Sequence, residues 1–170
     1  MPGKTIPGSV DNNIQPGYLD ITQVSTSLDG TMLTVVFTLR ELPEQLTINR
    51  KDAREAFIEI SWEVAIDVDN DLKTGGSLPE IGSGIDAYLG IGNIKFPQAK
   101  EKTEAIAVAI ASLSNPFSNN QKPGSATVDL IAKTITVTAD IPNIKPDSYL
   151  VFFTTYDGAP TIAVDRLCTR

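Results

Sequence analysis

The residues with the clearest chemical potential are the acidic side chains of the segment Asp67-Val68-Asp69-Asn70-Asp71. Asp67, Asp69 and Asp71 stand at every second position, and on an extended backbone alternate side chains point to the same side. Carboxylates that converge in this way repel one another unless a cation lies between them. A hard cation with about six to eight oxygen ligands suits such a set, and calcium fits it best. We therefore predict a calcium site at Asp67, Asp69 and Asp71.

A fourth carboxylate, Asp86, is expected beside Asp67. It follows a loop rich in Gly, Pro and Ser (69–84) and lies in the next strand pattern, 85–94. A loop that returns from one strand to the next favours neighbouring strands, which would place Asp86 next to Asp67. Main-chain carbonyl groups around residues 72–74 would complete the shell of oxygen ligands.

The acidic loop does not match the EF-hand. With Asp67 as its first position, that motif requires glycine at the sixth position and glutamate at the twelfth. The chain has Leu72 and Leu78 there. The alternative to a cation site is an acidic turn that is simply solvated.

The strand pattern before this loop, 57–68, carries further carboxylates. Apolar residues alternate along it and include Trp62, which we expect in the core. Glu59, Glu63 and Asp67 share the opposite face. We expect this face to be exposed to solvent, and the alternative is a second cation-binding cluster.

The sequence as a whole predicts an all-β fold. Short alternating runs are separated by turn residues, and Asp29-Gly30 between two such runs is a strong hairpin signal. We expect about eight or nine strands, at 19–27, 31–39, 57–68, 85–94, 104–113, 126–131, 134–140, 149–156 and 161–167. This pattern is typical of a single β-sandwich of jelly-roll or Ig-like type, covering residues 18–170.

Residues 1–17 differ from the remainder of the chain. They contain three Pro-Gly pairs and few apolar residues, which predicts an extended N-terminal arm and excludes a helix. Two interpretations stay open: a disordered tail, or an arm that docks on a neighbouring subunit.

The composition of the chain excludes several classes of function. The 170 residues carry a formal net charge of −7 at pH 7, which argues against nucleic acid as a partner because phosphates bind basic surfaces. Histidine is absent, so a triad with histidine is excluded and the commonest zinc ligand is missing. The single Cys168 cannot form a disulfide within the chain. No carboxylate stands out as a catalytic acid, so we expect no enzyme.

No apolar run reaches the roughly 18 residues that span a bilayer, so we expect no membrane span. No signal peptide is visible in the opening residues. A cytoplasmic protein and a mature secreted form are both compatible with this. We favour an extracellular protein, because calcium sites of this kind need the calcium levels found mostly outside cells.

Several short motifs resemble secreted prokaryotic β-sandwich domains with a calcium loop, the broad group that includes carbohydrate-binding and DOMON-like modules. They are Tyr18-Leu19-Asp20-Ile21, Leu28-Asp29-Gly30, the loop Ile66 to Asp71 followed by Thr74-Gly75, and Gly84-Ile85-Asp86-Ala87-Tyr88-Leu89. Within this group the chain most resembles the cannula-forming proteins of hyperthermophilic archaea. Those proteins are small acidic subunits that polymerise into extracellular tubules with calcium.

The resemblance implies a jelly-roll subunit with calcium ions at subunit contacts and an extended terminal strand that completes a neighbour's sheet. The matching positions are Asp67, Asp69, Asp71 and Asp86 for calcium, and the arm up to Gly17 for strand exchange. We therefore expect a calcium-dependent homopolymer that builds a filament or tubule. The alternative is a secreted carbohydrate-binding module with structural calcium, which would bind surface glycans through exposed aromatic rings.

Overall fold

The computed structural model describes residues 3–43, 60–78, 81–92, 105–109, 121–156 and 163–169. Apart from one short 3-10 helix, η1 (Gly17–Leu19), its regular elements are antiparallel β-strands. They form a five-stranded sheet, a six-stranded sheet and a two-stranded hairpin. The predicted all-β sandwich is confirmed, and the described residues contain more strands than the eight or nine expected.

The five-stranded sheet has the order β1-β2-β3-β11-β10. Its strands are β1 (Lys4–Pro7), β2 (Ile21–Asp29), β3 (Met32–Leu39), β10 (Ser125–Asp129) and β11 (Thr134–Asp140). The predicted hairpin at Asp29-Gly30 is confirmed, since Asp29 pairs with Met32 and Gly30 has a φ of 59°. Glycine adopts this left-handed backbone without a steric penalty.

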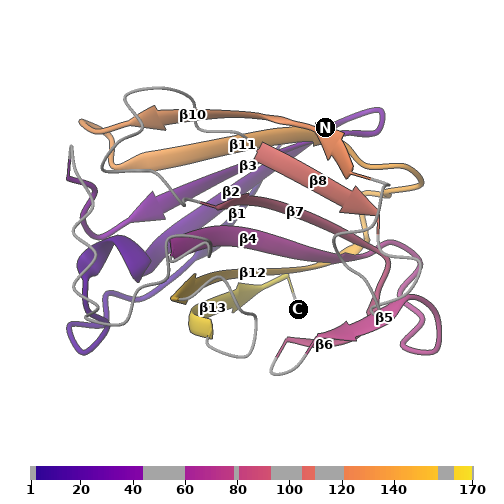
Figure 1. The fold of residues 1–170 in the computed structure, drawn as a ribbon, viewed down its shortest axis with the longest axis horizontal. Coiled ribbons are helices and arrows are strands. Elements are labelled where there is room, and N and C mark those ends of the chain that lie inside the picture. Colours follow the sequence, from indigo (N-terminus) through magenta and orange to yellow (C-terminus); the bar gives the residue numbers. More distant parts are fainter. Residues whose placement is uncertain are drawn as a thin grey trace.

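The six-stranded sheet has the order β13-β12-β4-β7-β8-β9. Its strands are β4 (Ile60–Asp67), β7 (Ala87–Gly92), β8 (Ala105–Ala109), β9 (Gln121–Pro123), β12 (Tyr149–Tyr156) and β13 (Ala163–Cys168). β4 lies inside this sheet, between β12 and β7 (Figure 1).

The main core lies between the two sheets. Fully buried side chains from both sheets meet there, and the rings of Phe37 and Phe152 form an edge-to-face pair with centroids 6.3 Å apart. The Trp62 indole belongs to this core, as predicted, and its Nε1 donates to the carbonyl of Tyr18 at 2.9 Å.

A second apolar cluster lies on the other face of the six-stranded sheet. The hairpin of β5 (Gly76–Leu78) and β6 (Gly82–Ile85) contributes Leu78, Ile81 and Ile85 to it. They pack against side chains of β4 and β12, including Ala65 and Phe153. The segment predicted as an irregular loop therefore contains a small hairpin that covers the sheet.

This second layer corrects the prediction for β4. Alternation predicted one exposed face, but all eight residues of β4 are buried. Glu63 retains only 5% of its exposure, and Asp67 is completely buried. Glu59 lies outside the described residues. At Ala65 the β5–β6 hairpin covers this outer face, and such long-range packing is not revealed by the pattern of one strand.

The N-terminal arm is paired with its own chain in this structure. Lys4 to Pro7 form an antiparallel ladder with Thr26 to Gln23 at the edge of the five-stranded sheet. The strand β1 is short, and only Ile6 is partly buried. This intrachain pairing differs from a disordered tail, and exchange of the strand between subunits stays a proposal.

Candidate metal centre

The acidic loop begins where two neighbouring strands place Asp67 and Asp86 together. β4 and β7 pair antiparallel with Ile66 opposite Ala87, which confirms the predicted adjacency. The main-chain N–H of Asp86 donates to the carbonyl of Ile66 at 2.8 Å, and an Asp86 carboxylate oxygen accepts from the N–H of Val68 at 2.9 Å. Asp86 is therefore held by hydrogen bonds beside the end of β4.

Asp69 reaches this position through a turn and not through strand alternation. β4 ends at Asp67, and Asn70 adopts a left-handed φ of 60°, a conformation that Asn tolerates better than most residues. The N–H of Asn70 donates to Asp67 at 2.6 Å, and the N–H of Asp71 donates to Asp69 at 2.9 Å. These local bonds wind the loop and return the Asp69 carboxylate toward Asp67.

The three carboxylates of Asp67, Asp69 and Asp86 form one cluster. Each can offer an oxygen such that the three oxygens lie within 4.8 Å of one another. Asp67 is buried, Asp86 is half-buried and Asp69 is exposed. Among the described residues, none of the three has an ion pair with a lysine or arginine. Within the part of the chain that the structure describes, the cluster therefore has no basic counter-ion.

One oxygen of Asp67 has no partner. Its Oδ1 accepts the N–H of Asn70, whereas its Oδ2 is buried and makes no hydrogen bond. A buried carboxylate oxygen without a partner is costly, and buried charges are normally paired or bind a metal. This oxygen is an available ligand inside the cluster.

The pKa values of Asp67 and Asp69 reflect burial and the closeness of the three carboxylates. Burial raises the pKa of Asp67 above its ordinary value, and the negative charges of Asp69 and Asp86 raise it further. The pKa of Asp69 is lowered, chiefly by the hydrogen bond from the Asp71 N–H. The proximity of the two carboxyl groups thus raises the pKa of Asp67, whereas it lowers that of Asp69. A cation between them would favour the ionised form of both groups.

Asp71, the remaining predicted ligand, is placed differently. Its carboxylate accepts the N–H of Lys73 at 2.9 Å, and the structure does not bring it into the cluster. Its main-chain carbonyl accepts both the N–H and the hydroxyl of Thr74, at 3.1 and 2.8 Å. That carbonyl also lies beside Gly84, as does the unpartnered oxygen of Asp67. Any role of Asp71 as a carboxylate ligand stays a prediction.

Two glycines allow the loop to close over the cluster. Gly84 has a φ of 81°, and a Cβ there would lie 3.1 Å from both Asp67 Oδ2 and the Asp71 carbonyl. Gly75 has a φ of 61°, and its Cβ would lie 2.7 Å from a carboxylate oxygen of Asp86 and would overlap the carbonyl of Ile85. Side chains at these positions would fill the space around the carboxylates.

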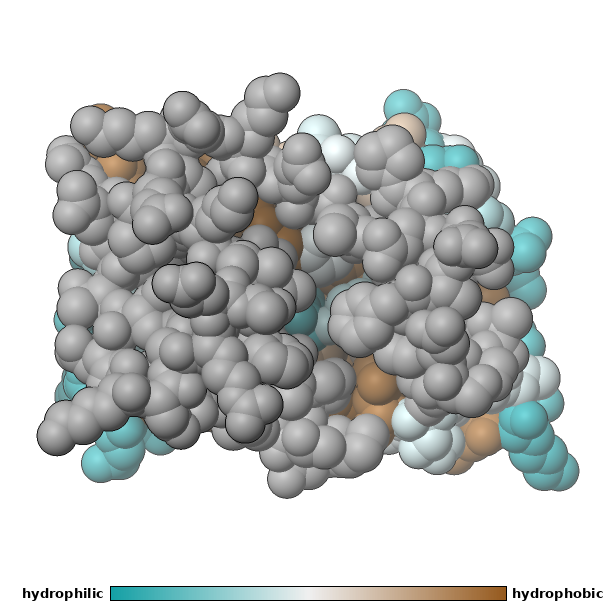
Figure 2. Space-filling model, in the orientation of Figure 1, coloured by the Kyte–Doolittle hydropathy of each residue, from teal (hydrophilic) through white to brown (hydrophobic). Residues whose placement is uncertain are grey.

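The loop is also tied to the segment before β12. The amide of Asn70 donates to the carbonyl of Asp147 at 3.0 Å, and the hydroxyl of Ser148 donates to the carbonyl of Val68 at 3.1 Å. Sequence reasoning missed this connection, because the partners are far apart in the chain. In Figure 2 hydrophilic residues gather at the right-hand end, where Figure 1 places this loop region next to β5.

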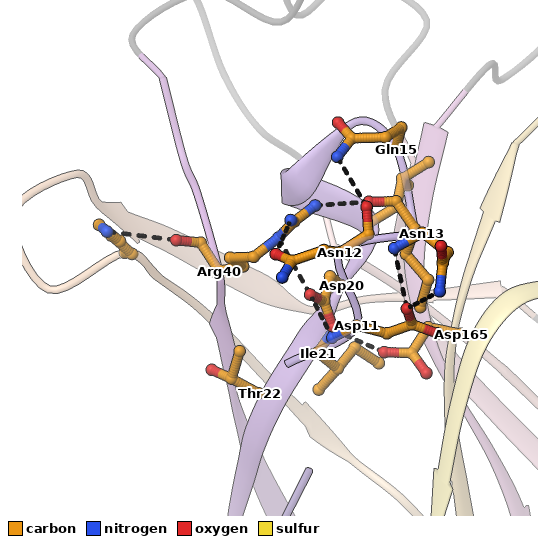
Figure 3. A network of polar contacts seen from close by, with 12 residues as sticks. Asp11, Asn12, Asn13, Gln15, Asp20, Ile21, Thr22, Arg40 and Asp165 are labelled. Carbon is orange, nitrogen blue, oxygen red and sulfur yellow. Dashed lines mark hydrogen bonds and ion pairs between the residues drawn. The ribbon is translucent and has the colours of Figure 1, made fainter. Parts of the chain in front are cut away.

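A second group of carboxylates lies near the start of β2 and joins the arm to β13 (Figure 3). Asp20 is completely buried and pairs with Arg40 at 3.0 Å. The N–H of Asp11 donates to the Asp20 carboxylate at 3.1 Å. The N–H of Ile21 donates to the Asp165 carboxylate at 2.6 Å. Burial raises the pKa of Asp165, and the charges of Asp20 and Asp11 add to this effect.

This second group differs from the first because it contains its own cation. The Arg40 guanidinium donates to the amide oxygen of Asn12 at 2.9 Å and to the carbonyl of Ile14, in addition to its ion pair with Asp20. The arginine thus connects residues 12–14 of the arm to the sandwich. We interpret this network as structural, and the cluster at Asp67 as the candidate metal centre.

Comparisons of the chain with protein-family models, with curated proteins and with solved structures found no match. The fold is an all-β sandwich, and the site is a group of carboxylates at the end of a central strand. The site must therefore be interpreted from its own geometry.

Proposed function

We propose that this protein is a calcium-binding structural subunit that assembles with copies of itself into an extracellular filament or tubule. The observation that carries the proposal is the buried, unpartnered oxygen of Asp67 within the cluster of Asp67, Asp69 and Asp86. An all-oxygen ligand set with several carboxylates suits a hard cation, and calcium tolerates irregular oxygen geometry better than magnesium does.

Calcium would stabilise the folded chain in two ways. It would compensate the repulsion among three carboxylates for which the described residues provide no basic partner, and it would fix the loop whose Asn70 contacts the segment before β12. Ligands that bind only the folded state raise its stability by mass action. Neutralising part of the net charge of −7 would also weaken the repulsion between subunits.

The edge strand β1 supports assembly by strand exchange. It lies at one end of the five-stranded sheet, is four residues long and has a single partly buried side chain. A strand held mainly by main-chain hydrogen bonds can form the same bonds with a second copy. In the proposed polymer, β1 of one subunit pairs with β2 of the next, and the contact repeats without closing.

The alternative, a carbohydrate-binding module, receives less support from the described side chains. Sugar-binding modules stack pyranose rings on exposed aromatic side chains. Trp62 and Tyr18 are buried, and Tyr88 and Tyr149 are half-buried against the second apolar cluster. No aromatic ring among the side chains that the structure describes is exposed.

No helix in the described part of the chain is long and apolar enough to cross a membrane.

The proposal is tested with light scattering and negative-stain electron microscopy of purified protein before and after addition of calcium, with magnesium as the control. We expect calcium to cause growth into filaments or tubes. Asp67→Asn should abolish this growth. Asp29→Asn is the matched control, because it makes the same change of charge on an exposed residue of the β2–β3 hairpin.

Three outcomes separate the parts of the proposal. Protein that binds calcium with a raised melting temperature but remains monomeric at high concentration would leave a calcium site and exclude the polymer. A melting temperature that does not change when calcium is added would exclude the metal centre. Loss of growth in both variants would show that net charge, and not the Asp67 site, controls assembly.

A further inference from the structure

The two larger sheets end in four edge strands within the described ranges, β1 and β10 in one sheet and β13 and β9 in the other. Three of these strands contain residues that oppose pairing with a further strand. β1 and β9 each contain a lysine and a proline, and β13 contains Asp165 and Arg166. Proline cannot donate to a ladder of main-chain hydrogen bonds, and charged side chains on an edge resist close contact.

The fourth edge strand, β10, has no such protection. It contains no proline, and its one charged residue, Asp129, stands at its last position. It pairs with β11 without a bulge, and within the described part of the chain only β11 forms main-chain hydrogen bonds with it. Figure 1 shows β10 at the upper margin of the five-stranded sheet. The outward N–H and C=O groups of its alternate residues can therefore bind another strand.

The side chains of β10 suit an antiparallel copy of the same strand. Ala126 and Val128 pack against the core and are partly buried, whereas Ser125, Thr127 and Asp129 alternate with them and have more exposure. A register centred on Thr127 places the threonines of the two copies opposite each other. Ser125 then lies opposite Asp129 on the outer face, and Ala126 lies opposite Val128 on the core side. Threonine pairs and apolar pairs across strands both stabilise a sheet.

The polar groups on this outer face are available for bonds between copies. Among the side chains that the structure describes, the hydroxyls of Ser125 and Thr127 have no hydrogen-bond partner. Asp129 uses Oδ1 to accept two N–H groups of the following turn, both at 2.9 Å, which leaves Oδ2 for the serine of the other copy. The hydroxyls of Thr34 and Thr138 already pair across β3 and β11 in this sheet, at 3.1 Å.

The charges near β10 are compatible with this register. The two Asp129 carboxylates would stand at opposite ends of the ladder, four residues or about 13 Å apart. This separation exceeds the Debye length of about 8 Å at physiological ionic strength. Lys133 is the only charged residue of the turn 130–133, and its ammonium donates to the carbonyl of Arg40 in the same chain at 3.2 Å.

We propose that β10 pairs antiparallel with β10 of a second copy and joins two molecules into a symmetric dimer. The two five-stranded sheets then form one continuous sheet across the dimer axis. The contact is isologous and closes after two copies, and a ladder of five residues makes it weak and reversible. It uses neither the acidic loop nor β1, which lies at the opposite edge of the sheet. The dimer is therefore independent of the proposed function.

The test is sedimentation of the full chain in EDTA, at physiological ionic strength and from about 10 μM to about 1 mM protein. Wild-type protein should change reversibly from monomer to dimer and grow no further. Thr127→Lys and Thr127→Glu each place like charges opposite each other at the axis, and each should raise the dissociation constant about tenfold. Thr31→Lys and Thr31→Glu make the same changes at an exposed residue of the β2–β3 turn. These control variants should dimerise as the wild type does.

An equimolar mixture of Thr127→Lys and Thr127→Glu provides the decisive arm. The register brings the two opposite charges together at the axis, so the mixture should dimerise at least as tightly as the wild type. Wild type that stays monomeric, a mixture that associates no better than its components, or growth beyond the dimer in EDTA would overturn the pairing.

Calcium separates this dimer from the proposed function. Thr127→Lys should still form filaments with calcium, and Asp67→Asn should still dimerise in EDTA. Wild type that is monomeric in EDTA but polymerises with calcium would overturn the pairing of β10 alone. A dimer that does not respond to calcium would overturn the proposed function alone.

Discussion

The pH dependence of stability should be dominated by Glu63. This residue lies in the middle of β4, opposite Phe153 on one side and Gly90 on the other. It is almost completely buried, and its Oε2 has no hydrogen-bond partner. Burial raises the pKa of Glu63 from 4.5 to about 8, although a hydrogen bond with Ser61 lowers it in part. The glutamic acid is therefore neutral in the folded protein at pH 7.

The sign of the effect follows from these two pKa values. Below pH 4.5 the side chain is protonated in both the folded and the unfolded chain, and its ionisation does not affect stability. Between pH 4.5 and about 8 the unfolded chain releases the proton while the folded chain keeps it, so stability is lost progressively as the pH rises. At about 1.4 kcal/mol per pKa unit, the total loss is about 5 kcal/mol, a large part of the stability of an ordinary domain.

Glu63→Gln should remove this loss, because the amide stays neutral at every pH. We expect the variant to match the wild type near pH 4.5 and to exceed it by several kcal/mol at pH 8.5. At this chain length that difference corresponds to about 10–20 °C in melting temperature. Urea unfolding in EDTA, followed by the fluorescence of the single, buried Trp62, measures it. Glu41→Gln, at an exposed position, is the control.

Parallel loss of stability in the wild type and in Glu63→Gln would refute the reasoning. It would mean that water reaches the carboxylate and that Glu63 ionises at its ordinary pKa in the folded protein. Because Asp67 and Asp165, whose pKa values are also raised, are present in both proteins, their contributions cancel in the comparison.

Four further perturbations test the site and the arm. Calcium at a hundredfold excess over its dissociation constant should stabilise the wild type by about 2.7 kcal/mol, or about 5–10 °C, and Asp67→Asn should lose this gain in thermal melts. Gly75→Ala should destabilise the chain by at least about 1–2 kcal/mol in urea titrations, because its φ is 61° and a Cβ would overlap a main-chain carbonyl; a neutral result would mean that the loop relaxes freely. Arg40→Met should cost about 3–5 kcal/mol by leaving the buried Asp20 carboxylate without its cation, and unchanged stability would show that this ion pair is dispensable. Deletion of residues 1–7 should lower the melting temperature only slightly but stop calcium-induced assembly, and filaments of the truncated chain in electron micrographs would exclude exchange of β1.

Most strands could be predicted from the sequence because their information is local. The run Thr134 to Asp140 alternates apolar and polar residues, and β11 has the same bounds. The Asp29-Gly30 hairpin depends on one glycine with a left-handed backbone. The adjacency of Asp67 and Asp86 also follows from a short connection between two strands.

The parts that could not be predicted depend on long-range packing. The alternating pattern predicted that Glu63 lies on an exposed face of its strand, but this face is buried in the folded protein. The same applies to Asp71, whose side chain was expected beside Asp69 on an extended strand. The strand ends at Asp67, and hydrogen bonds within the turn set the direction of each later side chain.

The sequence by itself therefore determined the all-β class, the hairpin and the presence of a dense acidic loop, because turn residues and alternation are properties of neighbouring positions. Only the tertiary structure decided which carboxylates meet. It brought Asp67, Asp69 and Asp86 into one cluster, and it paired Asp20 with Arg40, which directly follows β3. The physical reason is that the state of a carboxylate depends on burial and on nearby charge, and both are set by segments distant in the chain.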